Sequence, residues 1–376
     1  MLTGACISRA GFNRATAYST ATWVLASEFP DIDIAYYLRG SVEAFAHHRG
    51  WTHTFMAAPL NAAVVVGGLY FFWRWRHSRN PETGHAPSLS GNSGHPSGSA
   101  DPETGHAPSL RKEFVHTSDI ANREPRWGLL LLFGVLASFV HILLDYVTAY
   151  GVRPFEPFSF QWYSYDIVSI IEPLWLIAMA AALALPFFFG LVSDEVGSHA
   201  RGPRGRGWAI AALMFVLALW GYRDYQHRRA LSALNSVLYK GSTAMRGSAY
   251  PYMVNPFAWH GVVDTRDFYQ TVEVNSRTGE MDDSDNGHTY YKPEETQVTL
   301  AAKKTRLGQI YLDWAVYPMI ETLAESDGGW EVRFYDLRYA FPGRTSTVLG
   351  GYVLLDKNLR VIEQGMGRRE AGQSTN

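Results

Sequence analysis

The sequence predicts a mostly α-helical membrane bundle followed by a small α+β soluble domain with an antiparallel sheet. Two observations predict this fold class: the long apolar runs all lie before Tyr222, and patterns typical of strands begin only after it. We therefore divide the chain of 376 residues into four parts. These are short N-terminal helices with the first span (1–79), a low-complexity cytoplasmic linker (80–126), spans two to four (127–222) and the soluble domain (223–370).

Apolar segments of membrane-spanning length support the bundle. A helix that crosses the ~30 Å hydrocarbon core needs roughly 17–25 apolar residues. Four segments meet or approach this length: Thr54 to Trp73, Trp127 to Leu144, Pro173 to Ser193 and Gly207 to Tyr222. The last is the shortest, but it lies between two arginines and has a tryptophan near each end, as interfacial anchors do. Two shorter helical patterns precede Pro30, and the sequence leaves open whether they form a re-entrant hairpin, interfacial helices or protein-buried segments.

The linker between the first two spans is rich in Gly, Ser, Pro and His, from Asn80 to Leu110, and the nonapeptide PETGHAPSL occurs in it twice. Such a segment is too polar to bury a core. Its histidines His85, His95 and His106 are therefore interpreted as part of a solvated linker rather than as a metal site.

The soluble domain is predicted from alternating segments bounded by turn residues. The expected strands are Thr271 to Asn275, Gln297 to Ala301, Glu331 to Tyr339, Thr347 to Leu355 and Arg360 to Gln364, and a helix is expected over Leu307 to Ala324. We expect these elements to form the antiparallel sheet of an α+β domain.

Basic residues predict how the bundle is oriented. Arginines and lysines crowd both ends of the linker and the loop between the third and fourth spans: Arg74, Arg76, Arg79, Arg111, Lys112, Arg123, Arg126, Arg201, Arg204 and Arg206. The positive-inside rule places both loops in the cytoplasm. The start of span one, the end of span two, the start of span three and the soluble domain then share the outer face.

Net charge and cysteine content exclude some classes of protein. The formal net charge is −2 and no basic stripe stands out, so we expect no nucleic-acid partner. The single cysteine, Cys6, cannot form an intrachain disulfide or build a thiolate zinc site. Any metal site must therefore use nitrogen and oxygen ligands.

Histidines and aspartates with the spacing of metal ligands lie at the predicted outer ends of the first two spans. His48 precedes the first span and His53 lies at its start, with Gly50 interrupting the helical pattern between them. His141 and Asp145 are four residues apart, which places them on one face of the second span. We expect these four side chains to converge.

More carboxylates lie at the same predicted face. Asp31 and Asp33 follow Pro30, and in an extended segment both would project to one side. Asp166 lies just before span three, as does Glu172. Ionisable groups gathered near a membrane are by default a functional site.

The candidate ligands suit a divalent metal: zinc, manganese, iron or magnesium, with histidine favouring the transition metals, and their number points to two or more ions. Asp31, Asp33, His48, His53, His141 and Asp145 are the predicted ligands, and they are too many for one tetrahedral zinc. A bound metal would activate water for attack, so we expect a hydrolase in which Asp31, Asp33 and Asp166 are the catalytic carboxylates.

Two arginines flank these motifs. The sequence leaves open whether Arg49 and Arg153 bind an anionic substrate oxygen in the forked manner of guanidinium or pair with nearby carboxylates. The expected partners of the protein are the lipid bilayer and a small-molecule or lipid substrate that is attacked at a phosphoryl or carbonyl centre.

The motifs PDID at Pro30, HHRGWTH at His47, HILLDYVTAYG at His141 and YDIVSIIEP at Tyr165 together resemble the YdjM-like family of inner-membrane metal-dependent hydrolases. The resemblance implies a multi-pass protein of the bacterial inner membrane. Through a distant similarity to zinc phospholipase C and zinc-dependent nucleases, it also implies phosphoester hydrolysis at a zinc cluster. Members of the family carry a threonine–histidine pair just ahead of the stretch that Leu2 to Ala5 resembles. That pair is not in this sequence, so either the start lies upstream or one ligand is missing.

Two other functions use the same residues. A transporter would bind a passing cation with them, although transport sites tend to lie near the bilayer midplane in broken helices. A non-catalytic membrane scaffold would hold a structural metal and present the soluble domain.

Overall fold

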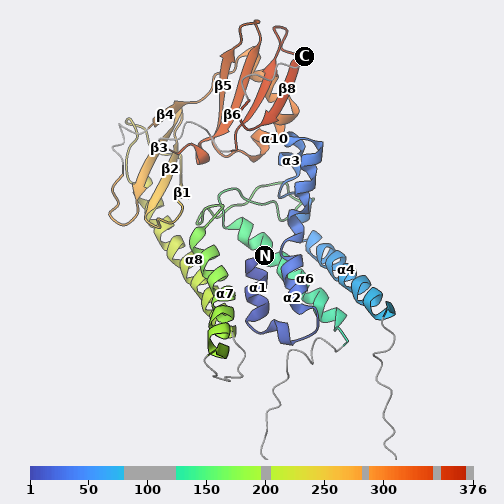
Figure 1. Cartoon of the computed structure of the whole chain (residues 1–376). Helices are drawn as coiled ribbons and strands as arrows, with labels where there is room; N and C mark the ends of the chain where they lie inside the picture. Colours follow the sequence, from blue (N-terminus) through green and yellow to red (C-terminus); the bar gives the residue numbers. More distant parts are fainter. Residues whose placement is uncertain (80–123, 196–204, 282–287, 342–348, 370–376) are drawn as a thin grey trace, which may run out of the picture.

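The computed structural model describes residues 1–79, 124–195, 205–281, 288–341 and 349–369 of the chain. A helical part forms one end of the molecule and two β-sheets form the other (Figure 1). The nonapeptide repeat and the linker histidines His85, His95 and His106 fall in residues 80–123, outside the described residues.

The helical part contains long helices at all four places where spans are predicted. The long helices are α4 (Ala57–Arg79), α6 (Trp127–Tyr146), α7 (Pro173–Glu195) and α8 (Arg206–Leu234). The short elements are α1 (Leu2–Arg9), η1 (Phe12–Arg14), α2 (Ser19–Ala26), η2 (Phe29–Arg39), α3 (Ser41–His47) and η3 (Trp51–His53). The N-terminal region is therefore helical, as predicted.

The prediction of four membrane spans is supported only in part. Among the described residues, α6 is the one helix that is long and apolar enough to cross a membrane by itself. The segment Ser41–His53 and α4 pass the same test only together, with a bend of 87° between them. The apolar part of α7, Pro173–Phe189, is shorter. Charged residues shorten the apolar run in α4, where Arg74 and Arg76 follow Trp73.

The first two α-helices, α1 and α2, form a hairpin packed inside the helical part. Cys6 of α1 is fully buried and joins a core cluster with Met179 and Val216 of α7 and α8. Trp23 of α2 packs against Phe133 of α6, with ring centroids 5.6 Å apart. Figure 1 shows this hairpin between α6 and the α7–α8 pair. The hairpin thus packs against the other helices of the bundle, α1 against α7 and α8 and α2 against α6.

Helices α4 and α6 pack closely because small residues face each other. A Cβ atom added to Gly134 of α6 would lie 2.9 Å from the Cβ atom of Ala62 in α4. Alanines also line the buried face of α4, including Ala58. Small residues let two helix backbones approach, which is how helices associate in membranes. This contact holds α6, which carries His141 and Asp145, beside the helix that directly follows His53.

The C-terminal domain contains two four-stranded antiparallel sheets, which confirms the predicted antiparallel architecture. The first sheet has the order β1 (Arg246–Pro251), β2 (Ala258–Asp264), β3 (Phe268–Asn275), β4 (His288–Tyr291). The second has the order β5 (Pro318–Ala324), β6 (Trp330–Asp336), β7 (Gly351–Leu355), β8 (Val361–Met366). Helices α9 (Gln297–Lys303) and α10 (Arg306–Trp314) and the turn η5 (Leu337–Tyr339) complete the domain.

Two predictions within this domain are wrong. The expected strand from Gln297 is helix α9, because Thr296 and Thr299 form a capping box that starts a helix there. The helix expected as far as Ala324 ends at Trp314, and strand β5 begins at Pro318. Proline has no amide hydrogen and its ring clashes with the preceding helical turn, so it does not continue a helix.

The C-terminal domain rests on the segment that joins α6 to α7. Arg338 donates a hydrogen bond to the carbonyl oxygen of Ala149 over 2.8 Å, and the indole of Trp314 donates one to the carbonyl of Tyr150 over 3.1 Å. A fully buried ion pair of 2.9 Å joins Arg223 of α8 to Glu172, just before α7. The domain is thus fixed above one end of the helices.

Gly134 offers a test of the α4–α6 contact. Gly134→Leu should destabilise the helical part by about 1–3 kcal/mol, because the added side chain would overlap Ala62 and force the helices apart. Gly128→Leu is the matched control, since nothing lies within 4 Å of a Cβ atom there. The measurement is the thermal midpoint in detergent. Equal midpoints for the two variants would show that the helices do not pack in this way.

Candidate metal centre

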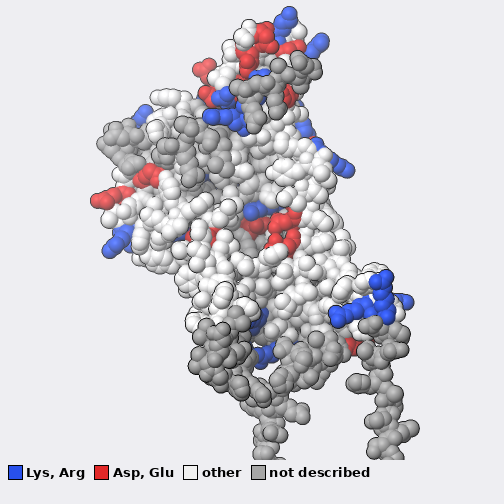
Figure 2. Space-filling view, in the orientation of Figure 1, with Lys and Arg blue, Asp and Glu red and all other residues white. Residues whose placement is uncertain are grey.

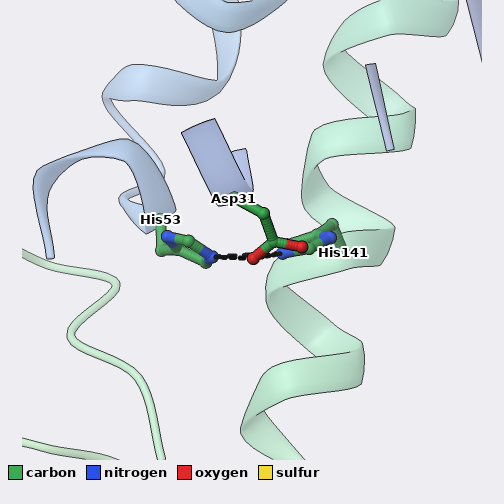
Figure 3. A group of neighbouring side chains, drawn as sticks. All are labelled: Asp31, His53 and His141. Carbon is green, nitrogen blue, oxygen red and sulfur yellow. Dashed lines mark hydrogen bonds and ion pairs between the residues drawn. The ribbon is translucent and has the colours of Figure 1, made fainter. Parts of the chain in front are cut away.

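Two histidines and two aspartates converge at the end of the helical part next to the C-terminal domain. The Nε2 atoms of His53 and His141 are 3.1 Å apart. Asp31 Oδ1 lies 3.3 Å from the first nitrogen and 3.5 Å from the second. Asp145 Oδ2 lies 3.3 Å from each. Figure 3 shows the side chains of Asp31, His53 and His141 meeting from three separate segments of the chain.

Backbone hydrogen bonding determines which nitrogen of His141 faces this centre. Its Nδ1 lies 2.7 Å from the carbonyl oxygen of Ser27, at the end of α2. A carbonyl only accepts hydrogen bonds, so Nδ1 carries the hydrogen and a neutral imidazole presents the lone pair of Nε2 to the centre. A histidine held in this way by a backbone carbonyl is typical of metal ligands.

His53 is held from its opposite side in a similar way. The residue is completely buried, and its Nδ1 lies 3.5 Å from Asp33 Oδ2 and 3.1 Å from the hydroxyl of Thr52. Asp33 is itself fixed, because Oδ2 accepts a hydrogen bond of 2.8 Å from the backbone amide of Arg49. With a hydrogen on Nδ1, Nε2 of His53 also presents a lone pair. The two Nε2 atoms, 3.1 Å apart, are close enough to share a hydrogen or to bind one cation between them.

Arg49 determines which oxygen of Asp145 is available. The guanidinium lies 2.9 Å from Asp145 Oδ1 and donates further hydrogen bonds to Thr148 Oγ1 and to the carbonyl of Gly151. Asp145 Oδ2 is buried and has no hydrogen-bond partner among the described residues, yet it points to both histidines. A buried carboxylate oxygen costs free energy when it has no partner. A metal ion would satisfy it.

Asp31 is the one of these four candidate donors that is open to its surroundings. Its side chain is 46% exposed, whereas the side chains of the other three are at most 12% exposed. Burial raises the pKa of the Asp31 carboxyl, but imidazoles protonated at Nε2, as His141 and His53 would be without a metal, outweigh this effect and lower the pKa well below its usual range. Asp31 is therefore ionised at neutral pH, as a metal ligand must be. Figure 2 shows acidic side chains reaching the surface at this level of the molecule.

The donor set suits a divalent transition metal. Two imidazole nitrogens and two carboxylate oxygens are ligands that zinc accepts in a four-coordinate site. Asp31, His53 and His141 alone offer ligand atoms that all lie within 4.8 Å of one another. Three carboxylates, including Asp33, surround the centre with one guanidinium, Arg49, so a cation would also balance charge.

The other predicted ligands lie around this group rather than in it. His48 Nδ1 is 3.5 Å from Asp33 Oδ1, on the far side of Asp33 from His53. The extended segment expected for the two aspartates is instead the 3₁₀ helix η2, so Asp31 and Asp33 approach opposite nitrogens of His53. The structure thus gathers one four-donor group and places Asp33 and His48 beside it.

Arg153 and Asp166 lie apart from the centre. Arg153 stacks on Trp162, 4.6 Å from the ring centroid, and contacts Asp313 of α10 at the edge of a cavity of about 250 Å³. Asp166 interacts with the side chain of Ser164, and the charges of Arg338 and Arg246 in the C-terminal domain also act on its carboxyl. Arg49 pairs with Asp145, which is one of the two roles that the sequence left open.

Two of the groups that hold the site were not predicted from the sequence. The carbonyl of Ser27 orients His141, but a backbone carbonyl has no sequence signature. Tyr150 lies under the guanidinium of Arg49, 4.8 Å from ring centroid to Cζ, and stands five residues after Asp145. A conspicuous YG pair after the predicted second span was the available signal for Tyr150.

Fold and centre together define a membrane-protein class: a helical part with a candidate span and a histidine–aspartate group at one end. The family model described as YdjM inner membrane protein matches residues 1–230, and the chain belongs to this family. The chain is also 23% identical over 176 residues to the uncharacterized protein YfhP of Bacillus subtilis (strain 168), which covers 46% of this chain and 39% of that protein. The chain thus matches well under half the length of that relative, and no solved structure matches.

Metal analysis tests the centre directly. Protein purified with zinc should retain metal, and His53→Ala and Asp145→Ala should each lose most of it, because each removes one of four donors. His47→Ala is the matched control, since this neighbouring histidine is exposed and pairs with Glu43. The measurement is elemental analysis after gel filtration. Unchanged metal content in both ligand variants would rule out the shared centre.

Asp166 predicts a pH-dependent contribution to stability. Burial raises the pKa of its carboxyl from 3.8 to about 6, so the folded state favours the protonated form. This contribution is complete below pH 3.8 and is lost as pH rises through about 6. Asp166→Asn cannot lose a proton, so its thermal midpoint relative to wild type should be higher at pH 7 than at pH 4.5. A difference that does not change between these pH values would contradict the assignment.

Proposed function

We propose that this protein is a membrane-embedded metal-dependent hydrolase that cleaves a phosphoester. The observation that carries the proposal is the convergence of two imidazole nitrogens and two carboxylate oxygens, at 3.1–3.5 Å, in a site that is buried except at Asp31. Membership of an inner-membrane family supports the location. The donor set supports zinc as the metal.

Bound zinc would supply a Lewis acid for the phosphoryl oxygen and a water of lowered pKa. The residues of the chain prepare the site for it. Ser27 and Asp33 fix the orientations of the two imidazoles, and Arg49 holds one oxygen of Asp145 so that the other points inward. Because these supports are buried, the ligand positions are set before any substrate arrives.

The exposed side of the centre is where a substrate would approach. Asp31 is the half-exposed ligand, and His48, also partly exposed, lies behind Asp33. Asp31 is placed to accept a proton from a water molecule held near the histidines, whereas Asp33 orients His53 from the other side of its ring. A second metal ion, if one binds, would find Asp33 and His48 within 3.5 Å of each other.

For the topology, we propose several membrane crossings with the centre on the outer face. Arginines gather at the opposite end of the helices: Arg9 lies beside Gly205, Arg206 donates a hydrogen bond to the carbonyl of Ala10, and α4 ends at Arg79. Figure 2 shows basic side chains at this lower end. The positive-inside rule makes that end cytoplasmic. The centre and the C-terminal domain then face outward.

Hydrolysis assays test the activity. Zinc-loaded protein should hydrolyse p-nitrophenyl phosphate or bis-p-nitrophenyl phosphate, and His53→Ala should abolish the reaction. Asp33→Asn should lower the rate by about 10–100-fold, because a group that orients a ligand is lost while all four donors remain. The measurement is release of p-nitrophenol, with His47→Ala as the control. Equal rates for wild type and His53→Ala would disprove a hydrolase at this centre.

A further inference from the structure

A row of aromatic rings connects helix α6 to the segment that follows the metal centre. The ring of Phe139 lies 5.5 Å from that of Phe55, and Phe55 lies 5.4 Å from Phe155. Phe155 in turn lies 5.4 Å from the ring of Tyr163. The backbone amide of Phe55 also donates a hydrogen bond of 2.9 Å to the carbonyl of Pro154. The turn formed by residues 154–160 is therefore fixed against the start of α4.

This turn exposes a cluster of phenylalanines. Phe155, Phe158 and Phe160 are 46%, 81% and 56% exposed, within six consecutive residues. Three large apolar side chains exposed together mark a surface that contacts a protein or a membrane. Such a cluster is unfavourable in a turn that is exposed to water, because each ring loses the free energy that its burial away from water would provide.

The exposed face of α6 indicates which environment surrounds the turn. Leu132, Leu136, Phe139 and Leu143 are 37–52% exposed and recur at the spacing of one helical face. His141 and Asp145 lie on the opposite, buried face of the same helix. Because α6 is the clear candidate span, its exposed leucines face lipid. Phe139 belongs to that face and touches Phe55, so the lipid-facing surface continues into the turn.

The metal centre lies one side chain away from this surface. Phe55 follows the ligand His53 by two residues, and Phe139 precedes the ligand His141 by two. Trp51, on the other side of His53, is 52% exposed, and tryptophan is enriched at the membrane interface. The ligands are thus at the depth where lipid headgroups meet the hydrocarbon.

We propose that the turn 154–160 inserts Phe155, Phe158 and Phe160 into the outer membrane interface, and that the centre acts on a phosphoester lipid whose acyl chains stay in the bilayer. The choice of a lipid rests on the proposed hydrolase function, whereas the location of the turn does not. A headgroup at this depth reaches the exposed side of Asp31 without the lipid leaving the membrane.

Depth measurements test the location of the turn. A spin label is attached to Phe158→Cys in a Cys6→Ala background, and the protein is reconstituted in lipid nanodiscs. The label should be more accessible to oxygen than to a water-soluble nickel chelate, as at Leu136→Cys on α6. Ile362→Cys, on the exposed face of β8, is the control and should favour nickel. A nickel-accessible label at residue 158 would overturn the proposal.

Substrates with long and short acyl chains test whether the substrate is a lipid that stays in the bilayer. The double variant Phe158→Ser, Phe160→Ser should hydrolyse dioleoyl phosphatidic acid in nanodiscs about tenfold more slowly than wild type, because the interface contact is lost. Its rate on soluble dihexanoyl phosphatidic acid should not change, and Ile362→Ser should alter neither rate. An equal fall on both lipids would overturn the lipid assignment.

Failure of the two proposals can be told apart. A wild-type protein that hydrolyses p-nitrophenyl phosphate but neither phosphatidic acid overturns the lipid substrate and leaves the hydrolase standing. A wild-type protein that hydrolyses none of the three overturns the hydrolase and the lipid substrate together. In either case the spin-label depth decides independently whether the turn lies in the membrane.

Discussion

Arg49 makes the interactions on which the rest of the centre depends. Its guanidinium pairs with Asp145 of α6, donates hydrogen bonds to Thr148 and Gly151, and stacks on Tyr150, while its backbone amide binds Asp33 of η2. One buried residue thus joins the N-terminal segment, the end of α6 and the segment beneath the C-terminal domain. Its φ angle of 52° is in the left-handed region, so the local backbone is strained and is held there by these contacts.

The sequence could predict those parts of this centre whose signal lies within a few neighbouring residues. His141 and Asp145 lie on one helical face, so their spacing alone indicates a pair. His53 and Asp31 come from separate segments, and their meeting was predicted only through the expected topology. Arg153 and Asp166 lie near the same motifs in the sequence, but they point to the C-terminal domain, because the segment after α6 runs under that domain. No local pattern records that path.

The fold shows the same division between local and long-range information. Antiparallel strands and a helical N-terminal region follow from periodicity, which depends on neighbouring residues. The number of membrane crossings does not, because helix length and apolar composition disagree: α8 has 29 residues, but its C-terminal half is charged. The wrong predictions at α9 and β5 also concern local signals. The threonine capping box and Pro318 are both visible in the sequence, and in the folded chain they determine the local structure more strongly than the pattern of apolar residues does.

The buried pair of Glu172 and Arg223 has a mechanical consequence. Arg223 also donates hydrogen bonds to the carbonyls of Tyr252 and Asn255, in the segment between β1 and β2 of the C-terminal domain, so a single side chain connects the domain to the helices. Moving the domain away would leave a buried charge without its partners, at a cost of several kcal/mol. The C-terminal domain and the helices should therefore move as one rigid unit. A displacement of the domain would also displace α7 and α8.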